Sequence, residues 1–329
     1  MLRIALVSAA AALLLNTATW AAEPVPLVLE TKIPLGSVSG RIDHLAFDAD
    51  GQRLFVAELG NDSVGVVDLR QGKVVHRIMG LKEPQGVAWH AGTATLYVAN
   101  AGDGSVRLYQ GPGLVPAGST PLGDDADNIR LDTWRNRVIV GYGDGALAVI
   151  DPMARRKTAE IRLKGHPESF QFDGSGTRIF VNVPDARQVA VVDAVSGSQI
   201  STLDSAGARS NFPMAVDADQ HRVLVAYRSP GLLKVFASAN GKPLASVETC
   251  GDSDDVFVDP RRHRVYVTCG AGAIDVFAQS GDAYDRLARI PTVSGARTSL
   301  YVPSTDRLYV AVRAASGEPA AIWIFRPQP

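Results

Sequence analysis

Acidic and other polar residues recur at one position of a repeated pattern in this sequence. The pattern returns about every 42 residues. Aligning its copies places one residue of each just before a short apolar run: Asp43, Gln85, Asp127, Glu168, Phe212, Asp254 and Arg297. The next aligned position holds His44, Gly86, Asn128, Ser169, Pro213, Asp255 and Thr298. Clustered carboxylates attract a hard cation such as Ca²⁺ or Mg²⁺, raise one another's pKa and can supply a general base.

These aligned positions, together with a histidine from a neighbouring loop, form a candidate ligand site if the fold brings them around one axis. The predicted site residues are Asp43, His44, Asp127, Asn128, His166, Glu168, Asp254, Asp255 and Arg297. Carboxylates crowded together repel unless Arg297 or a cation compensates them. The alternative is a solvated polar surface without a ligand, because Asp also suits tight turns.

Only two histidines, His44 and His166, are expected on the face that carries these residues. His221 and His263 share a turn position that places them on the opposite face. A zinc or copper site built on three histidines therefore lacks ligands here. A His44–His166 pair assisted by carboxylates stays open as an alternative to histidines that only hydrogen-bond a loop.

Common catalytic and cofactor motifs are absent from the sequence. It contains no G-x-S-x-G elbow, no phosphate-binding Walker loop, no C-x-x-C pair, no H-E-x-x-H string and no haem attachment motif. The alternating glycines of residues 141–145 join two predicted strands, so they indicate a hairpin turn and not a nucleotide-binding loop.

The candidate residues are positioned by seven copies of one four-stranded unit. The second strand of each copy is the most regular, as in Arg53–Ala57, Thr95–Ala99 and Arg307–Ala311. In the first copy, apolar runs at 43–48, 53–58, 64–68 and 74–79 alternate with turns rich in Gly, Asp and Asn. Seven such units predict an all-β fold, a single seven-bladed β-propeller domain over residues 23–329.

The two ends of the chain predict how this ring closes. The seventh copy stops after its third strand, Ala321–Phe325, and Pro26–Leu35 has the pattern of a strand without a unit of its own. We expect this N-terminal strand to complete the last blade. Closure of that kind removes two exposed strand edges that would otherwise favour aggregation.

The repeats resemble the YVTN family of β-propeller repeats. The clearest match is Pro84–Ala88, followed by Leu96–Asn100 and then Gly104–Val106. The resemblance covers nearly the whole chain after residue 22 and implies a propeller. It implies less about function, because that family includes surface and periplasmic proteins and related propellers include lactonases and dehydrogenase subunits.

The first 22 residues predict a signal peptide. Arg3 precedes an apolar run, Ile4–Leu15, that is too short to span a bilayer, and small residues suit cleavage after Ala21 or Ala22. We therefore expect a periplasmic or secreted protein, monomeric and without a membrane span once this segment is removed.

Two cysteines, Cys250 and Cys269, suit a disulfide in such an oxidising compartment. A hairpin of residues 254–259 with 264–269 places Cys269 opposite Asp254, and Cys250 can then fold back toward it. Two free, buried thiols are the alternative.

Composition narrows the function classes further. The chain has 33 Lys and Arg against 34 Asp and Glu, so no basic surface predicts nucleic-acid binding. The leading hypothesis is a non-catalytic binding propeller whose channel mouth takes a small molecule or a partner protein, with no cofactor. The alternative is a metal-assisted hydrolase or lyase, such as a lactonase, in which the carboxylates hold Ca²⁺ or Mg²⁺.

Overall fold

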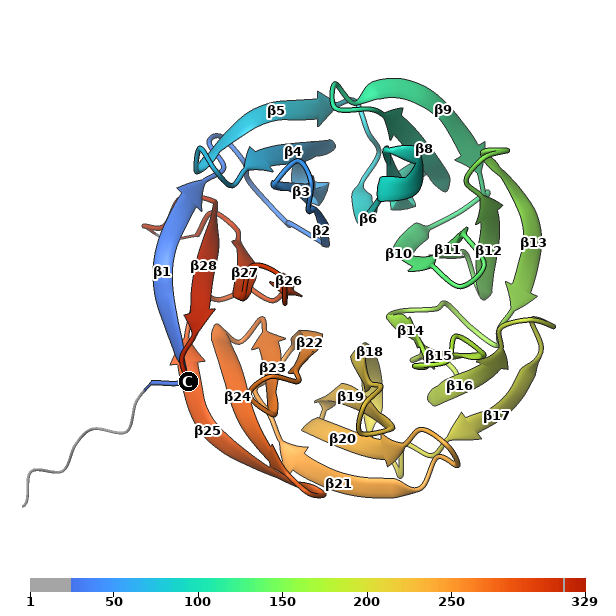
Figure 1. Cartoon of the computed structure of the whole chain (residues 1–329), viewed down its shortest axis with the longest axis vertical. Helices are drawn as coiled ribbons and strands as arrows, with labels where there is room; N and C mark the ends of the chain where they lie inside the picture. Colours follow the sequence, from blue (N-terminus) through green and yellow to red (C-terminus); the bar gives the residue numbers. More distant parts are fainter. Residues whose placement is uncertain (1–24, 316) are drawn as a thin grey trace, which may run out of the picture.

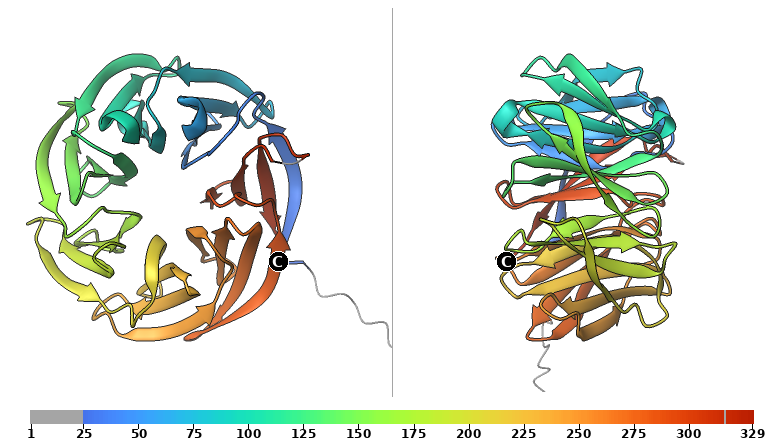
Figure 2. Two further views of the ribbon diagram at one scale, coloured as in Figure 1. Left: turned by 180° about the vertical axis from the view of Figure 1, so that it is seen from behind. Right: turned by 90° about the vertical axis from the view of Figure 1, so that its right-hand side faces the viewer.

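The repeated strand pattern folds into seven four-stranded antiparallel sheets around a central axis, which confirms the predicted seven-bladed β-propeller (Figures 1 and 2). The computed structural model describes residues 25–315 and 317–329. The predicted signal peptide, residues 1–22, lies outside this range. Within the described residues, no helix is both long and apolar enough to cross a bilayer.

The first three blades follow the predicted order, with the first strand of each nearest the axis and the fourth at the rim (Figure 1). Blade 1 contains β2 (Leu45–Asp48), β3 (Arg53–Glu58), β4 (Ser63–Asp68) and β5 (Lys73–Met79). Blade 2 contains β6 (Pro84–His90), β7 (Thr95–Asn100), β8 (Ser105–Gln110) and β9 (Val115–Pro121). Blade 3 contains β10 (Ala126–Asp132), β11 (Arg137–Tyr142), β12 (Ala146–Asp151) and β13 (Arg156–Arg162). Short 3₁₀ turns lie at η1 (Leu59–Asn61), η2 (Ala91–Thr93) and η3 (Ala101–Asp103).

The next three blades repeat this arrangement. Blade 4 contains β14 (Phe170–Phe172), β15 (Arg178–Val183), β16 (Gln188–Asp193) and β17 (Gln199–Leu203). Blade 5 contains β18 (Arg209–Asp217), β19 (Arg222–Ser229), β20 (Gly231–Ala237) and β21 (Pro243–Glu248). Blade 6 contains β22 (Ser253–Asp259), β23 (Arg264–Cys269), β24 (Ala273–Ser280) and β25 (Ala283–Pro291).

The seventh blade is shared between the two ends of the chain, as the sequence predicts. It contains β26 (Ser299–Val302), β27 (Arg307–Val312), β28 (Ala321–Pro327) and, at the rim, β1 (Leu27–Pro34). The strands β1 and β28 run antiparallel, with Ile33 opposite Ile322. The N-terminal strand therefore closes the ring by covering the edge of β28.

Apolar packing lies between neighbouring blades. The described residues form seven hydrophobic clusters, and each joins strands of two adjacent blades. The cluster that closes the ring packs Ile33, Leu35 and Ile322 of blade 7 against Leu54 and Val56 of blade 1. Second strands are apolar on both faces because each is covered by a blade on either side.

A repeated arginine links neighbouring blades on the face where first strands turn into second strands. Arg178, the first residue of β15, donates to Asp173 Oδ2 at 3.0 Å and to the Ser238 carbonyl of blade 5 at 2.6 Å. Equivalent arginines in blades 1, 3, 5 and 6 also reach a carbonyl of the following blade: Arg53 to Pro112, Arg137 to Ala194, Arg222 to Gly281 and Arg264 to Gln328. The repeat therefore encodes an inter-blade clamp as well as a strand.

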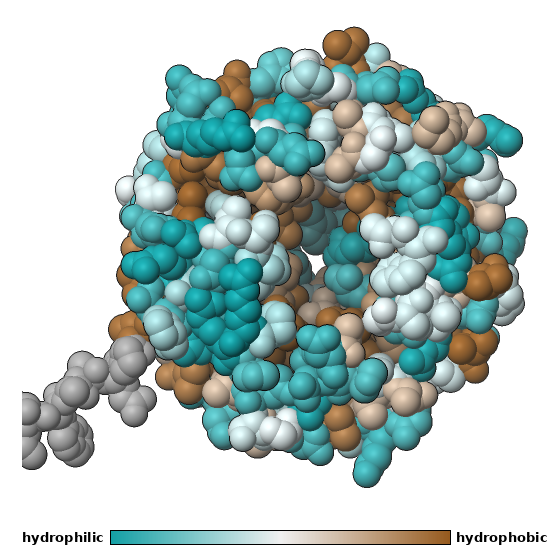
Figure 3. Space-filling model, viewed as in Figure 1, coloured by the Kyte–Doolittle hydropathy of each residue, from teal (hydrophilic) through white to brown (hydrophobic). Residues whose placement is uncertain are grey.

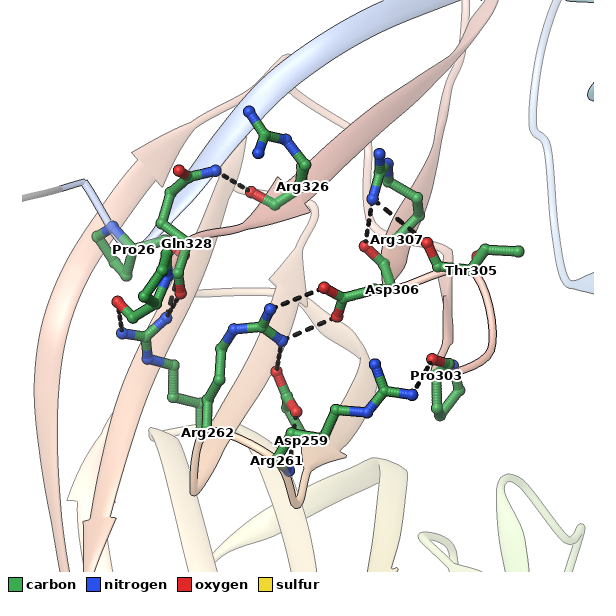
Figure 4. A network of polar contacts seen from close by, with 12 residues as sticks. Pro26, Asp259, Arg261, Arg262, Pro303, Thr305, Asp306, Arg307, Arg326 and Gln328 are labelled. Atoms are coloured by element: carbon green, nitrogen blue, oxygen red, sulfur yellow. Dashed lines mark hydrogen bonds and ion pairs between the residues drawn. The ribbon is translucent and has the colours of Figure 1, made fainter.

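The junction of blades 6 and 7 carries the densest version of this network (Figure 4). Arg262 pairs with both oxygens of Asp306, at 2.8 and 2.7 Å, and with Asp259 Oδ2 at 2.9 Å. Arg264 donates to the carbonyls of Pro26 and Gln328, which flank β1 and β28. Blade 6 thus holds the residues that flank the closing strand pair.

Replacing Arg178 with alanine tests the inter-blade clamp. Arg178→Ala should lower the free energy of unfolding by about 2 kcal/mol, because it removes hydrogen bonds made by a charged group and leaves the buried Asp173 without its main partner. Urea denaturation followed by circular dichroism measures the change. Arg162→Ala is the matched control, since that side chain is 89% exposed and should matter by less than about 0.5 kcal/mol. Equal effects of the two changes would contradict the clamp.

Candidate ligand-binding site at the channel mouth

One end of the central channel opens into a polar cavity of about 270 Å³. We call it the mouth cavity. Its lining residues come from all seven blades or from the loops that lead into them: Arg41, Asp43, His44, Gln85, Asp125, Asp127, Asn128, His166, Glu168, Ser169, Phe212, Arg228, Asp254 and Arg297. All seven residues of the first aligned position lie here, although they are far apart in the sequence. The space-filling view shows the channel as a hollow at the centre of the ring (Figure 3).

Eight of the nine predicted site residues line the mouth cavity, and Asp255 does not. Asp255 lies deeper, in a second cavity of about 330 Å³ that we call the channel cavity, which it shares with Arg130. The backbone N–H of Ser299 donates to Asp255 Oδ2 at 2.7 Å and holds the carboxyl against blade 7. Burial raises the pKa of Asp255 well above its usual range, and neighbouring Asp254 adds to this effect.

Several first strands begin with an irregular register, and this irregularity turns the mouth residues toward the channel axis. The pairing of β10 with β11 shifts register between Ala126 and Ile129, so Asp127 and Asn128 lie at the irregularity. The corresponding strands of blades 2, 5 and 6 shift at the same aligned position. A β-bulge redirects side chains locally. Gly86 completes the geometry, because a side chain there would collide with the Asp127 carbonyl of the next blade.

Arginines compensate the carboxylates of the mouth cavity. Arg41 Nη2 lies 2.6 Å from Asp43 Oδ2, and Arg297 Nε lies 3.0 Å from Asp254 Oδ2. Arg228 also pairs with Asp254, and its guanidinium stacks 3.8 Å from the centre of the Phe212 ring. Ion pairs therefore offset part of the repulsion among the carboxylates of the mouth.

Sequence reasoning missed Arg228 and assigned no role to Arg41. Arg228 lies near the end of β19, the second strand of blade 5, whereas the alignment examined residues that precede first strands. Blade 5 carries Phe212 at the aligned acidic position. An aromatic ring at this position can stack against an arginine, so Phe212 was the one sequence feature that could have indicated Arg228.

Two histidines flank Asp127. His44 Nε2 lies 4.0 Å from Asp127 Oδ1, and His166 Nε2 lies 3.8 Å from Asp127 Oδ2. The ring Nδ1 of His166 contacts the Gly143 carbonyl at 2.7 Å. Since a carbonyl only accepts, Nδ1 is the donor. The structure thus places both predicted histidines beside one carboxylate.

Burial and neighbouring charges set opposite protonation states for these histidines. Burial lowers the pKa of His44 and outweighs the charge of Asp127. Burial also acts to lower the pKa of His166, but Asp127, the Gly143 carbonyl and Asp125 together raise it to about 9. For Asp127, burial acts to raise the pKa, yet His166 and His44 lower it overall. At neutral pH, His44 is therefore neutral, whereas His166 and Asp127 are charged.

The carboxyl of Glu168 in the mouth cavity has a strongly raised pKa. Burial, reinforced by the charge of Asp127, raises its pKa to about 8. Burial also raises the pKa of Asp43 to about 6, although Arg41 opposes that shift. At pH 7, Glu168 is therefore mostly protonated and Asp43 mostly ionised.

Two buried oxygens of the mouth cavity accept no hydrogen bond from the protein. They are Asp127 Oδ1 and Asn128 Oδ1, whose residues are only 6% and 2% exposed. Asp43 Oδ2 also lacks an aligned hydrogen bond, although it contacts Arg41 as an ion pair. An unsatisfied buried polar group costs about 1–3 kcal/mol. All three atoms are acceptors, so the cavity is suited to a molecule that donates hydrogen bonds.

The side chains that would bind a metal ion are not grouped together in this structure's described residues. Among residues 25–315 and 317–329, no group of three or more His, Cys, Asp or Glu side chains is placed to hold one. The carboxylates that suggested Ca²⁺ or Mg²⁺ face arginines and histidines. The geometry therefore gives the cation-dependent alternative no centre in the described part of the chain.

The two cysteines are joined in the structure, with their Cα atoms 5.9 Å apart. Cys269 pairs with Ser253 and not with Asp254, because the register of β22 and β23 shifts between Ser253 and Asp255. The disulfide fixes the loop that leads into β22, which carries Asp254 to the mouth cavity.

Comparisons with known proteins support the fold. The chain is similar to a chain of the Kuenenia stuttgartiensis hydrazine synthase structure, with a TM-score of 0.74 and 18% identity over 85% of this chain and 97% of that one. It is also similar to the WD40 repeats of RRP9, with a TM-score of 0.77 and 12% identity over 91% and 97%. Identities this low show a shared propeller architecture alone.

No protein-family model and no curated protein matches the sequence. The resemblance to the YVTN repeats therefore stays a prediction, whereas the propeller itself is established by the structure.

Chelation tests the cation alternative. Treatment with EDTA should leave the melting temperature unchanged, and mass spectrometry of the purified protein should find no stoichiometric metal. Adding millimolar Ca²⁺ or Mg²⁺ should not stabilise the protein. An ion at 100 times its dissociation constant would instead add about 2.7 kcal/mol of stability. Stoichiometric metal, with a fall in melting temperature on its removal, would restore the metal-assisted alternative.

Proposed function

We propose that this protein is a non-catalytic binding propeller that takes a small polar ligand into the mouth cavity. The observation that carries the proposal is the pair of buried acceptor oxygens, on Asp127 and Asn128, that have no partner within the protein. Buried polar groups are normally satisfied, so an exception in a cavity calls for an explanation, and a bound molecule supplies one. A ligand that donates hydrogen bonds would satisfy them.

The ion pairs around the cavity support binding because they hold the side chains in place before a ligand arrives. Asp254 lies between two arginines, and Asp127 lies between two histidines. A preorganised site loses less conformational entropy on binding than a flexible one. The cavity is also concave and formed by several blades, as ligand sites usually are.

Export to the periplasm or outside the cell is part of the proposal. The N-terminal segment has the composition of a signal peptide. The Cys250–Cys269 disulfide supports an oxidising compartment, since structural disulfides are rare in the cytosol.

Blocking the mouth cavity tests the proposed site. Gln85 lies across the cavity edge, between Arg41 at 3.3 Å and Asp125 at 3.4 Å. Small polar metabolites that raise the melting temperature of the wild-type protein should lose this effect in Gln85→Trp, because the indole fills part of the cavity. The loss should exceed tenfold in dissociation constant, measured by calorimetry.

Gln220→Trp is the matched control. Gln220 is exposed in the turn between β18 and β19, on the face away from the mouth cavity. This variant should bind as the wild type does. Ligands that bind Gln85→Trp normally, or that map to the outer strands, would overturn the proposed site.

A further inference from the structure

We infer that the ligand of the mouth cavity is an organic cation with N–H donors, such as a primary ammonium, bound by Asp127 and Asn128. This inference rests on the proposed function and adds the chemical class of the ligand. It follows from which hydrogen-bonding groups of the cavity are already used, which are free, and how the charges balance.

The three arginines of the cavity already pair with carboxylates. Arg41 pairs with Asp43, and Arg228 and Arg297 both pair with Asp254. An anionic ligand would have to compete with a buried carboxylate for its arginine. Each arginine is thus better suited to shaping the cavity than to binding an anion.

Two of the free groups are buried acceptors. Asp127 Oδ1 and Asn128 Oδ1 belong to adjacent residues of β10, are buried and have no hydrogen-bond donor. His44 Nε2 lies 4.0 Å from Asp127 Oδ1, beyond hydrogen-bond distance. An ammonium has three N–H donors and no acceptor, so its hydrogen-bonding groups match a pair of free acceptors.

The charge balance favours a cation over a neutral donor. The lining residues include three arginines and His166 on the basic side, and Asp43, Asp125, Asp127 and Asp254 on the acidic side. Glu168, which is mostly protonated, is a further acidic residue without a basic counterpart in this count. When Glu168 loses its proton, one negative charge is unmatched, and one ammonium restores neutrality.

Proton release from Glu168 therefore accompanies binding. The charged groups that face Glu168 are Asp127 of β10, His166 of its own loop, Asp254 of β22 and Arg228 of β19. Its pKa of about 8 in the free protein means that affinity for a cation should rise with pH between 6.5 and 8.5. Deprotonation of His166, with a pKa of about 9, acts in the same direction at the upper end of this range.

Four probes with one butyl chain separate the ligand classes: butylammonium, 1-butanol, butyrate and butyltrimethylammonium. Each is titrated into the full mature chain, and binding is followed by NMR chemical shifts of mouth residues. Primary amines titrate near 10.4, as the Lys side chain does, so butylammonium stays charged throughout. We expect butylammonium to bind at least fivefold more tightly at pH 8.5 than at pH 6.5. We expect the other three probes to bind at least tenfold more weakly than butylammonium at pH 8.5.

Three variants locate the interaction. Asp127→Asn should weaken butylammonium binding at least tenfold, and Glu168→Gln should remove most of the pH dependence. Asp219→Asn, an exposed acid on the opposite face, is the matched control and should leave both unchanged. Hydrogen-exchange protection of the three variants checks that each is folded.

The outcomes separate the inference from the proposed function. Tighter binding of butanol or butyrate at the mouth, weakened by Asp127→Asn, would overturn the cation and keep the site. Equal binding of butyltrimethylammonium and butylammonium would show that charge matters and N–H donation does not, which also overturns the inference. Shifts confined to other surfaces, or no mouth shift with any probe, would overturn both.

Discussion

The pairing of β1 with β28 is the interaction on which the rest of the structure depends. Each blade of a propeller packs on two neighbours, so an unclosed ring would leave two apolar sheet faces and a free strand edge in water. Here Ile33 and Leu35, near the end of β1, join the cluster between blades 7 and 1, and Arg264 of blade 6 binds the carbonyl groups at both ends of the chain. The first and last segments of the sequence therefore complete one sheet and the ring together.

Closure of the ring determines what lies at the channel mouth. Residues that precede the first strands converge on one axis only because all seven blades are present. Convergence alone would bring repelling carboxylates together, and arginines at three positions compensate them. The compensation leaves Asp127 between two histidines, with one oxygen still free. The mouth cavity thus combines a rigid, nearly neutral wall with a few unsatisfied acceptors.

The sequence predicts the fold and most of the mouth, because both follow from the period of the repeat. The seven second strands, the closing strand at Pro26–Leu35 and the aligned residues Asp43 to Arg297 all lie where the repeat places them. Arg228 was not predicted, since it reaches the mouth from the end of a second strand. The depth of Asp255 depends on its contact with blade 7, and the inter-blade role of the repeated arginines depends on carbonyls about 60 residues away. The arginine recurs in the sequence, but its carbonyl partner is set by the packing of the next blade and leaves no local pattern.

The central claim is that the mouth cavity is built to receive hydrogen-bond donors. A crystal structure of the mature protein with butylammonium, at a resolution that distinguishes individual ligand atoms, tests it most directly. The account predicts the ammonium nitrogen within about 3.2 Å of Asp127 Oδ1 and Asn128 Oδ1, with the arginine–carboxylate pairs unchanged. Density for the ligand elsewhere, or Asp127 and Asn128 turned to accept hydrogen bonds from the protein itself, would contradict it.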